Sequence, residues 1–215
     1  APGNIQEESM SLDFIHTNES LEAIVRGMDV KPKDRILAVC SSGDQAFALL
    51  EKAGYVKAVD NEEEQVRYAQ RRRKMLKERL IKRFFPYGRG FENKNYFSKE
   101  RIAKLVKKTR YLKITNADIF MEDEGLDNFN KVYLSNAATF RGNKPKEVDR
   151  FLYRLTQKLA NPGIVYMAIE PIEYWCEKRM IREGFCLDTE LTAIARLYER
   201  RDGTLWTPVV YRRKA

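Results

Sequence analysis

The sequence predicts an α/β fold, with a doubly wound, mostly parallel seven-stranded sheet that ends in a C-terminal antiparallel hairpin. Short apolar runs of strand length alternate about five times with longer segments of helical spacing, which indicates a parallel sheet with right-handed crossovers. Two segments rich in β-formers then flank Arg201-Asp202-Gly203, a sequence typical of a hairpin turn.

The expected strands are short and mostly apolar. Run 36–40 has charged residues on one side and Ser-Ser-Gly on the other, as expected for a strand that is buried on both faces of a parallel sheet. The last two strands instead alternate apolar and polar residues. The seven expected strands span residues 36–40, 55–59, 111–115, 131–134, 163–169, 191–199 and 205–211.

Helices are expected where apolar residues recur at intervals of three and four. This spacing runs from Leu21 to Met28, and the side-chain oxygen of Asn18 or Ser20 can cap the first turn. Ser98 can cap a later helix in the same way. The six expected helices span residues 20–28, 45–52, 62–84, 98–108, 145–159 and 172–183.

Length and composition indicate one domain. A chain of 215 residues with 43% apolar residues can bury a sizeable core. We expect a single domain over residues 1–215, with 1–30 as an N-terminal helical extension. No apolar run approaches the ~20 residues of a transmembrane helix. Three cysteines without metal-ligand spacing and a single histidine predict no metal site and reduced thiols. We therefore expect a cytoplasmic protein, with a peripheral position at a membrane surface as the alternative.

The net charge of +9 permits three interpretations. Charged residues of both signs make up 33% of the chain, as is typical of the solvated surfaces of proteins from hot environments. In the basic stretch 67–83, however, Arg71, Arg72, Arg73 and Lys74 are consecutive. These side chains could neutralise the phosphates of a nucleic acid. A helix of this kind could also lie on an anionic lipid surface.

The candidate ligand site follows from the residues that come directly after the expected strands, because ligands bind at the carboxyl ends of strands in open α/β sheets. Gly43 can adopt a positive φ in the first turn. Asp60 lies 17 residues later and can bind a ribose diol, close to the ~20-residue spacing of nucleotide-binding units. The predicted cofactor-binding residues are Cys40, Ser41, Ser42, Gly43, Asp44, Asp60, Asn61, Asn116, Ala117, Asp118, Ser135 and Asn136.

This pattern predicts an adenosine-containing cofactor, and the first turn favours S-adenosylmethionine (SAM) over NAD. NAD usually requires a glycine-rich turn that seats its pyrophosphate at a helix N-terminus. Here the turn has one glycine, and the carboxylate of Asp44 would repel a diphosphate. The same carboxylate would attract the ammonium and sulfonium groups of SAM.

The predicted order of elements, with its terminal hairpin, resembles the Rossmann-like fold of class I SAM-dependent methyltransferases. The segments ILAVCSSGDQAFALL (36–50) and VKAVDNEEEQ (56–65) are in addition similar to the SAM-binding segments of SAM:diacylglycerol 3-amino-3-carboxypropyltransferases, the first enzymes of betaine-lipid synthesis. The similarity extends to NESLEAI (18–24), NYFSKERIAKL (95–105) and VYLSNA (132–137).

The resemblance to that transferase family has implications for the site. It implies SAM contacts at Ser41, Gly43, Asp44 and Asp60, and an active-site role near Ser135 and Asn136. Two features depart from the family: Gln45 stands where an Asn is usual, and the members of the family are commonly much longer than 215 residues.

We therefore expect a SAM-dependent transferase that acts by in-line displacement at the sulfonium. Attack on the methyl group, the first expectation, leaves S-adenosylhomocysteine. Attack on the γ-carbon, which transfers the aminocarboxypropyl group, leaves methylthioadenosine. A SAM- or nucleic-acid-binding module without turnover is a third alternative.

The expected acceptor is a small molecule or a lipid, with nucleic acid as the alternative. A hydroxyl or amine acceptor can require a base, and His16, Tyr133 and Asn136 are the candidates for a catalytic role. The aromatic-rich segment 85–97 is expected to form a lid or a wall for the acceptor.

Overall fold

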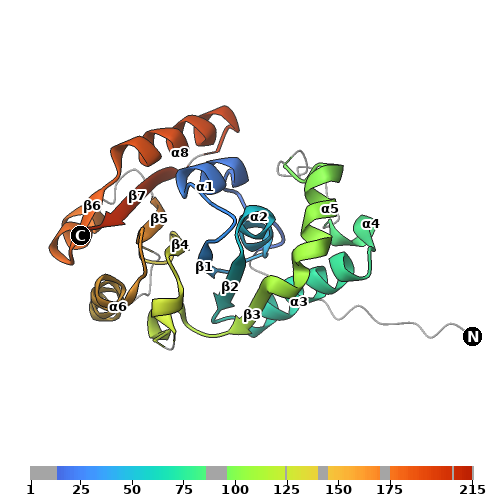
Figure 1. Cartoon of the computed structure of the whole chain (residues 1–215), viewed down its shortest axis with the longest axis horizontal. Helices are drawn as coiled ribbons and strands as arrows, with labels where there is room; N and C mark the ends of the chain where they lie inside the picture. Colours follow the sequence, from blue (N-terminus) through green and yellow to red (C-terminus); the bar gives the residue numbers. More distant parts are fainter. Residues whose placement is uncertain are drawn as a thin grey trace, which may run out of the picture.

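The computed structural model describes residues 14–85, 96–123, 125–139, 145–169, 175–204 and 206–214. Within this part of the chain, helices cover both faces of a seven-stranded sheet (Figure 1). The strands are β1 (Arg35–Val39), β2 (Tyr55–Asp60), β3 (Leu112–Asn116), β4 (Lys131–Ser135), β5 (Ile164–Ile169), β6 (Phe185–Leu187) and β7 (Thr207–Arg213). The α-helices are α1 (Leu21–Gly27), α2 (Asp44–Lys52), α3 (Glu63–Lys77), α4 (Ile81–Phe84), α5 (Lys99–Lys108), α6 (Pro145–Lys158), α7 (Trp175–Arg182) and α8 (Thr189–Arg201).

The sheet has the order β3-β2-β1-β4-β5-β7-β6. Strands β1 to β5 are parallel to one another, whereas β7 lies antiparallel between β5 and β6. The chain proceeds outward from β1 to β3, then returns to the other side of β1 with β4. This reversal makes the sheet doubly wound and places a switch point between β1 and β4. The predicted fold class is confirmed.

The antiparallel pair at the C-terminal end uses a different first strand from the one expected. Residues 191–199 form most of α8 rather than a strand, and β6 precedes this helix. Asp188 caps α8, because its side chain accepts a hydrogen bond from the backbone N–H of Leu191 at 3.0 Å. Leu191 and Ala195, four residues apart, are both buried, which is helical spacing. The same residues also alternate apolar and polar, which is the pattern of a strand. The two patterns coincide in this segment, and the cap at Asp188 favours the helix.

The expected long basic helix 62–84 is interrupted. It divides into α3 and the single turn α4, and Arg79 between them has a φ of +59°. A residue in the left-handed region cannot continue a right-handed helix. The break turns α4 back toward α2, where the ring of Phe84 packs edge-on against Phe47 with 5.1 Å between centroids.

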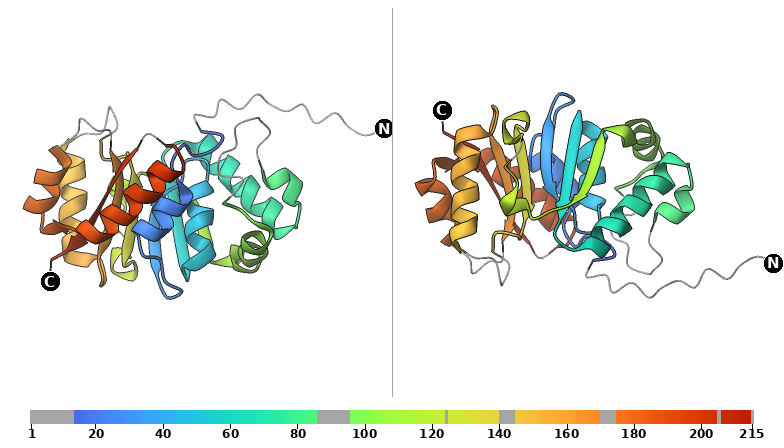
Figure 2. Two further views of the ribbon diagram at one scale, coloured as in Figure 1. Left: turned by 90° about the horizontal axis from the view of Figure 1, so that it is seen from above. Right: turned by 90° about the horizontal axis from the view of Figure 1, so that it is seen from below.

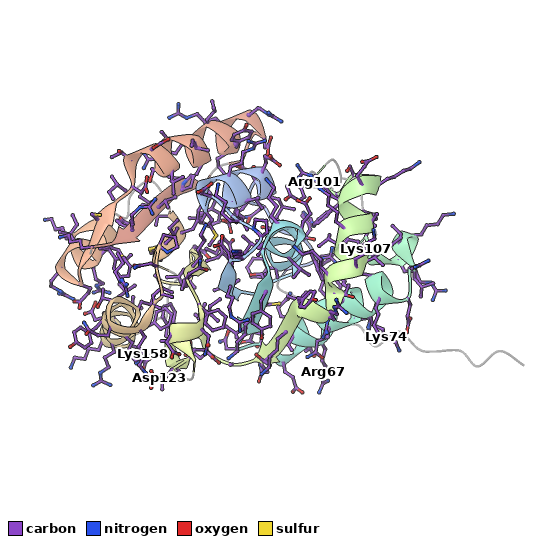
Figure 3. The ribbon with its side chains drawn as sticks, in the orientation of Figure 1. Arg67, Lys74, Arg101, Lys107, Asp123 and Lys158 are labelled. Atoms are coloured by element: carbon purple, nitrogen blue, oxygen red, sulfur yellow. The ribbon has the colours of Figure 1, made fainter. Side chains whose placement is uncertain are left out.

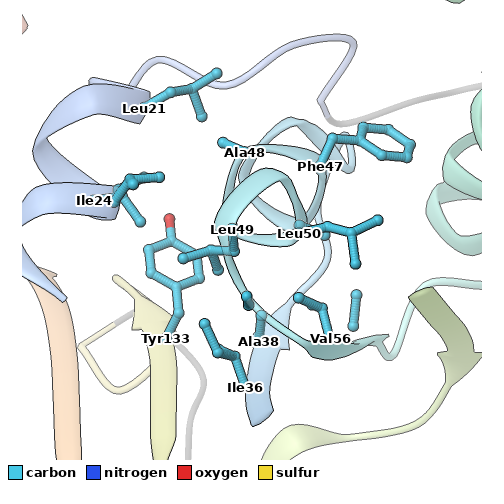
Figure 4. Packing of buried hydrophobic residues seen from close by; sticks show 14 of the residues in the cluster. Leu21, Ile24, Ile36, Ala38, Phe47, Ala48, Leu49, Leu50, Val56 and Tyr133 are labelled. Carbon is cyan, nitrogen blue, oxygen red and sulfur yellow. The ribbon is translucent and has the colours of Figure 1, made fainter. Parts of the chain in front are cut away.

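Alternate residues of each strand form two separate cores. Ile36 and Ala38 of β1 face the side covered by α1, α2 and α8, and Leu37 faces the side covered by α6 and α7. Figure 2 shows these two layers of helices from above and below the sheet. In Figure 4, side chains of α1, α2, β1 and β4 meet in the first core. Both faces of the central strands are thereby removed from water.

Helix α1, within the expected N-terminal extension, belongs to this first core. Leu21 and Ile24 are fully buried, and α1 packs along α8. Gly27 permits the close approach of the two helices, because a Cβ at this position would lie 2.7 Å from the Cβ of Ala195. The segment that enters α1 is therefore held at a fixed place over the sheet.

The junction between the start of α1 and the end of α8 contains a buried carboxylate. Glu199 is only 2% exposed and accepts a hydrogen bond from the backbone N–H of Ser20 at 3.2 Å. Ser20 also caps α1 by accepting from the N–H of Ala23, and its hydroxyl donates to Asp202 at 2.5 Å. Burial raises the pKa of Glu199 to about 7, and the charge of Glu19 adds to the effect.

Within the described residues, no helix combines the length and the apolar character needed to span a membrane.

Glu199 makes the stability of the protein depend on pH. Because its pKa rises on folding, the folded state binds its proton more tightly, and the contribution of Glu199 to the free energy of unfolding falls as the pH rises from about 4.5 to about 7. Glu199→Gln removes this fall. Relative to the unaltered protein, we expect the variant to gain up to about 3 kcal/mol between pH 4.5 and pH 8.

Urea unfolding of both proteins at several pH values measures this gain. Glu190→Gln, on the exposed surface of the same helix, is the matched control. If Glu199→Gln changed the free energy of unfolding by the same amount at every pH, the raised pKa of Glu199 would not be the cause of the pH dependence.

Candidate functional site

A cavity of about 230 Å³ opens at the carboxyl ends of strands β1 to β4, beside the switch point of the sheet. This is the edge at which the sequence predicts the ligand site. Seven of the predicted residues line the cavity: Ser41, Asp60, Asn61, Ala117, Asp118, Ser135 and Asn136. The other predicted residues do not line it: His16, Cys40, Ser42, Gly43, Asp44, Asn116 and Tyr133.

The turn between β1 and α2 is held against the end of β2. The backbone N–H of Ser41 donates to Asp60 Oδ2 at 2.8 Å, and the N–H of Glu62 donates to Asp60 Oδ1 at 3.1 Å. Ser41 and Gly43 have φ angles of +44° and +89°. A Cβ on Gly43 would approach the ring of Phe47 to 3.0 Å, so glycine is required by both conformation and space. The turn thus presents Ser41 and Asp60 together to the cavity.

Asp44 has a different role from the one predicted. Its carboxylate is fully buried and forms an ion pair of 2.6 Å with the guanidinium of Arg72, which is 2% exposed. Its other oxygen accepts from the backbone N–H of Thr17 and from the hydroxyl of Ser42. The charge of Asp44 therefore faces the interior of the protein and not the cavity, and the expectation that it attracts the cofactor is wrong.

Arg72 likewise cannot bind a phosphate in this structure. Besides Asp44, its guanidinium donates to the backbone carbonyls of Ser42 and Phe84. Its neighbour Arg73 is half-buried and donates to the carbonyl of Thr109. Among the four consecutive basic residues, Arg71 and Lys74 are the exposed ones. Lys74 extends outward from α3 in Figure 3.

The ends of β2 and β3 are joined by backbone and amide hydrogen bonds. Asn116 donates through its side-chain amide to the carbonyls of Asp60 and Asn61, and so holds two residues of the lining without lining the cavity itself. Asp118 caps a short 3-10 turn by accepting from the N–H of Phe120 at 2.9 Å. Asp118 and Phe120 both line the cavity, beside the apolar side chain of Ile119.

The segment that precedes α1 forms one wall of the cavity, through residues other than the predicted His16. Gln65 of α3 bonds to both the N–H and the carbonyl of Phe14, and Tyr68 donates to the carbonyl of Ile15. These contacts fix the segment over the β1–α2 turn. As a result, Thr17, Asn18 and Glu19 line the cavity along with Phe14. His16 lies on the exposed side of the same segment.

Glu19 lines the cavity but is not among the predicted site residues. It is 2% exposed, and its Oε1 accepts hydrogen bonds from the hydroxyls of Ser135 at 2.5 Å and Tyr133 at 2.6 Å. Burial raises the pKa of Glu19, while these hydrogen bonds act in the opposite direction. Glu19 lies within NESLEAI (18–24), one of the segments similar to the transferase family, but neither the spacing nor the residue type indicated that its side chain would face the cavity.

Ser135 is placed by irregular backbone at the end of β4. The pairing of β4 with β5 shifts register between Tyr133 and Ser135, and Ser135 has a φ of +52°. Bulges and strained residues of this kind often redirect side chains at functional sites. Here the irregularity brings the Ser135 hydroxyl onto Glu19.

Tyr133 supports Glu19 from the core. Its ring is fully buried between strand and helices, and its hydroxyl points toward α1 (Figure 4). Burial, together with the charge of Glu19, raises the pKa of Tyr133 well above its usual value of 10. A tyrosine hydroxyl that keeps its proton and donates a hydrogen bond to a buried carboxylate is poorly suited to act as a base. The tyrosine therefore positions Glu19.

The aromatic-rich segment 85–97, expected to form a lid or acceptor wall, lies mostly outside the described residues. Phe85, Tyr96 and Phe97 are described: the rings of Phe85 and Phe97 pack against Phe84, and the ring of Tyr96 packs against Phe97. None of these three lines the cavity at the strand ends.

Solved structures share the fold of this chain. A TehB-like SAM-dependent methyltransferase from Corynebacterium glutamicum is 12% identical, with a TM-score of 0.55 over 91% of this chain and 88% of that chain. The N-methyltransferase NodS from Bradyrhizobium japonicum, in complex with S-adenosylhomocysteine, is 9% identical, with a TM-score of 0.52 over 91% and 86%. The cyclase SpnF is 10% identical, with a TM-score of 0.54 over 91% and 80%.

No protein-family model and no curated protein sequence matches the chain. At these low identities the structural similarity establishes the Rossmann-like methyltransferase fold. A fold can host several reactions, as the cyclase among these structures illustrates. The reaction must therefore be inferred from the residues of the site.

The Arg72–Asp44 pair predicts a large and specific loss of stability. Arg72→Met leaves the carboxylate of Asp44 buried without its cation, and we expect it to lower the free energy of unfolding by about 3–5 kcal/mol. Arg71→Ala, at the exposed neighbouring position, is expected to change it by less than about 0.5 kcal/mol. Equilibrium unfolding in urea measures both values. If both variants lost a similar amount of unfolding free energy, the effect of Arg72→Met could not be attributed to the ion pair with Asp44.

Proposed function

We propose that this protein is a SAM-dependent transferase, with methyl transfer as its reaction, and that the cofactor lies in the cavity across the ends of β1 to β4. The observation that carries the proposal is the position of Asp60 in a methyltransferase fold. Its carboxylate ends β2, lines the cavity, and is oriented by the N–H groups of Ser41 and Glu62. Each carboxylate oxygen has a further lone pair with which to accept a hydroxyl of a ribose diol.

The residues beside Asp60 suit an adenine ring. Val59, Ile119 and Phe120 offer apolar surface, and Asp118 lies next to them with a carboxylate that can accept from an exocyclic amine. This arrangement supports an adenosine moiety that extends from the end of β2 toward the end of β3.

The charge of the cavity supports SAM over a dinucleotide. Glu19, Asp60, Glu62 and Asp118 line it, and no Lys, Arg or His is among the described residues that do so. Four carboxylates in the lining of one cavity disfavour the diphosphate of NAD and favour a cofactor with sulfonium and ammonium groups. The carboxylates of the lining thus favour SAM in place of Asp44, whose charge is paired with Arg72 outside the cavity.

Transfer then proceeds by in-line displacement at the sulfonium, with the protein positioning the two reactants. Aminocarboxypropyl transfer is a second candidate, favoured by the similarity of the Ser41-Ser42-Gly43 turn to the transferases of betaine-lipid synthesis. The two reactions differ in the carbon attacked, and therefore in the nucleoside product. Contacts of Arg71 and Lys74 with a nucleic acid or an anionic lipid surface stay a prediction.

The role of Asp60 predicts a loss of cofactor affinity on mutation. Asp60→Ala removes two charge-assisted hydrogen bonds to the ribose, so we expect S-adenosylhomocysteine to bind at least about tenfold more weakly by calorimetry. Asp123→Ala is the matched control, since Asp123 is exposed, pairs with Lys158 and does not line the cavity. Thermal melts of both variants establish that they are folded.

Product analysis by mass spectrometry then identifies the group transferred. The protein is incubated with SAM and a small-molecule, lipid or RNA extract, with Asp60→Ala as the control for spontaneous decay of SAM. Protein-dependent S-adenosylhomocysteine indicates methyl transfer, and protein-dependent methylthioadenosine indicates aminocarboxypropyl transfer. Binding without either product would favour a module without turnover, and no binding would refute the proposal.

A further inference from the structure

We propose that a second cavity, between α4 and α5, binds a fatty acid, with the alkyl chain inside the cavity and the carboxylate beside three cations of its lining. This inference goes beyond the proposed function and does not depend on it. Among the described residues, none lines both this cavity and the one at the strand ends.

The second cavity lies at the end of the molecule next to the edge strand β3, where α4 and α5 both pack on α3 (Figure 1, Figure 2). Its volume is about 460 Å³, within the ~300–1,000 Å³ that is usual for small-molecule sites. Most of the described lining is apolar, as expected for a site that takes a hydrocarbon chain. The apolar residues are Ile81, Phe85, Phe97, Ile102, Ala103 and Val106.

The cavity follows from the break in the expected long basic helix. Arg79, with its φ of +59°, ends α3 and turns the chain into α4. Ile81 and Phe85, at the two ends of α4, then form one apolar wall. Ile102 and Val106, four residues apart on one side of α5, form another. An uninterrupted helix over 62–84 would not place the first pair beside the second.

Three cations complete the described lining: Arg79, Lys99 and Lys107. All three are exposed, so they lie where the cavity meets solvent. On the same helix, Arg101 and Lys104 pair with glutamates of α1 and α2. Within the part of the chain that the structure describes, the three lining cations have no carboxylate at ion-pair distance, and no Asp or Glu lines the cavity with them.

These cations make the mouth of the cavity complementary to an anion. Like charges that converge on one opening repel one another, and a bound carboxylate relieves this repulsion. Glu100 interacts with the charge of Lys99 but does not line the cavity. At Arg79, a glycine would adopt the positive φ at a lower cost, so the backbone does not account for the arginine. The apolar interior and the cationic mouth together fit an alkyl chain with one anionic end.

A single amphiphile fits this region better than a bilayer or a nucleic acid. A helix that lies on a bilayer inserts an apolar face, whereas Ile102 and Leu105 of α5 are buried in the protein. Leu80, 41% exposed, is one large apolar side chain beside α4, which is usual for a soluble surface. Single-stranded nucleic acids stack their bases on accessible rings, but Phe97 is only 4% exposed and packs on other aromatic rings.

The test measures the binding of matched probes to the full chain by calorimetry, below the concentrations at which the probes form micelles. Decanoate, decanol and decylamine share one alkyl chain and differ in charge, and hexanoate has the same carboxylate on a shorter chain. We expect decanoate to bind at least about tenfold more tightly than decylamine and than hexanoate, because charge and chain length both contribute. Decanol is expected to bind at least about threefold more weakly than decanoate.

Ala103→Trp tests the place of binding. Ala103 is exposed and lines the cavity, so an indole ring at this position fills part of the cavity without entering the core. We expect this variant to bind decanoate at least about tenfold more weakly. Ala193→Trp is the matched control, at an exposed alanine of α8 that does not line the cavity, and is expected to change the affinity by less than about twofold.

The double variant Lys99→Gln with Lys107→Gln tests the charge, and serves alone should Ala103→Trp not fold. We expect it to weaken decanoate at least about threefold and decanol by less than about twofold. Lys113→Gln with Lys178→Gln is the matched control, because both lysines are exposed, the change of net charge is the same, and neither lines the cavity.

The proposal is overturned if decanoate does not bind the unaltered protein, or if decanol or decylamine binds as tightly. It is also overturned if Ala103→Trp and the double variant of the lining lysines both leave the affinity for decanoate unchanged. Co-sedimentation with vesicles of phosphatidylglycerol and phosphatidylcholine, without binding of decanoate, would replace it with a bilayer contact. The affinity for S-adenosylhomocysteine, titrated separately, is expected to be the same in all these variants and tests the proposed function independently.

Discussion

The ion pair between Arg72 and Asp44 organises the structure around the candidate site. It lies in the dry interior, where an unpaired charge is costly, so the two side chains must stay together. Arg72 comes from α3 and bonds to the β1–α2 turn and to the last residue of α4, while Asp44 also holds the backbone of Thr17. Four segments are therefore fixed by one pair of charges, and the turn that presents Ser41 and Asp60 to the cavity depends on it.

The opposite end of the cavity is built from residues that are distant in the sequence. Glu19 bonds to Ser135, 116 residues away, and the adjacent Ser20 bonds to Glu199, 179 residues away. Helix α8 thereby holds the start of α1, which in turn holds Glu19 over the end of β4. The proton on Glu199 and the charge on Glu19 influence each other, since each carboxylate is buried near the other. The protonation of Glu199, at the contact between α1 and α8, is thus coupled to the charge of Glu19 in the candidate site.

The distribution of charge separates the surface from the cavity. The chain carries a net charge of +9, and labelled basic side chains such as Arg67, Lys74 and Lys158 lie at the edge of the molecule in Figure 3. The cavity at the strand ends is lined by four carboxylates and, among the described residues, by no basic side chain. Net charge is therefore a poor guide to the ligand, because the potential inside a partly buried cavity is set by its own lining.

The sequence by itself determined the alternation of strands and helices and the edge of the sheet at which a ligand binds. Periodicity and caps are local, and the carboxyl ends of parallel strands must meet, so Ser41, Asp60 and Ser135 were predictable as members of one site. Local periodicity did not decide segment 191–199, where two periods coincide. Only the tertiary structure decided that Asp44 faces an arginine and that Glu19 faces the cavity. The direction of a charge depends on partners tens of residues away, and no local pattern encodes those partners.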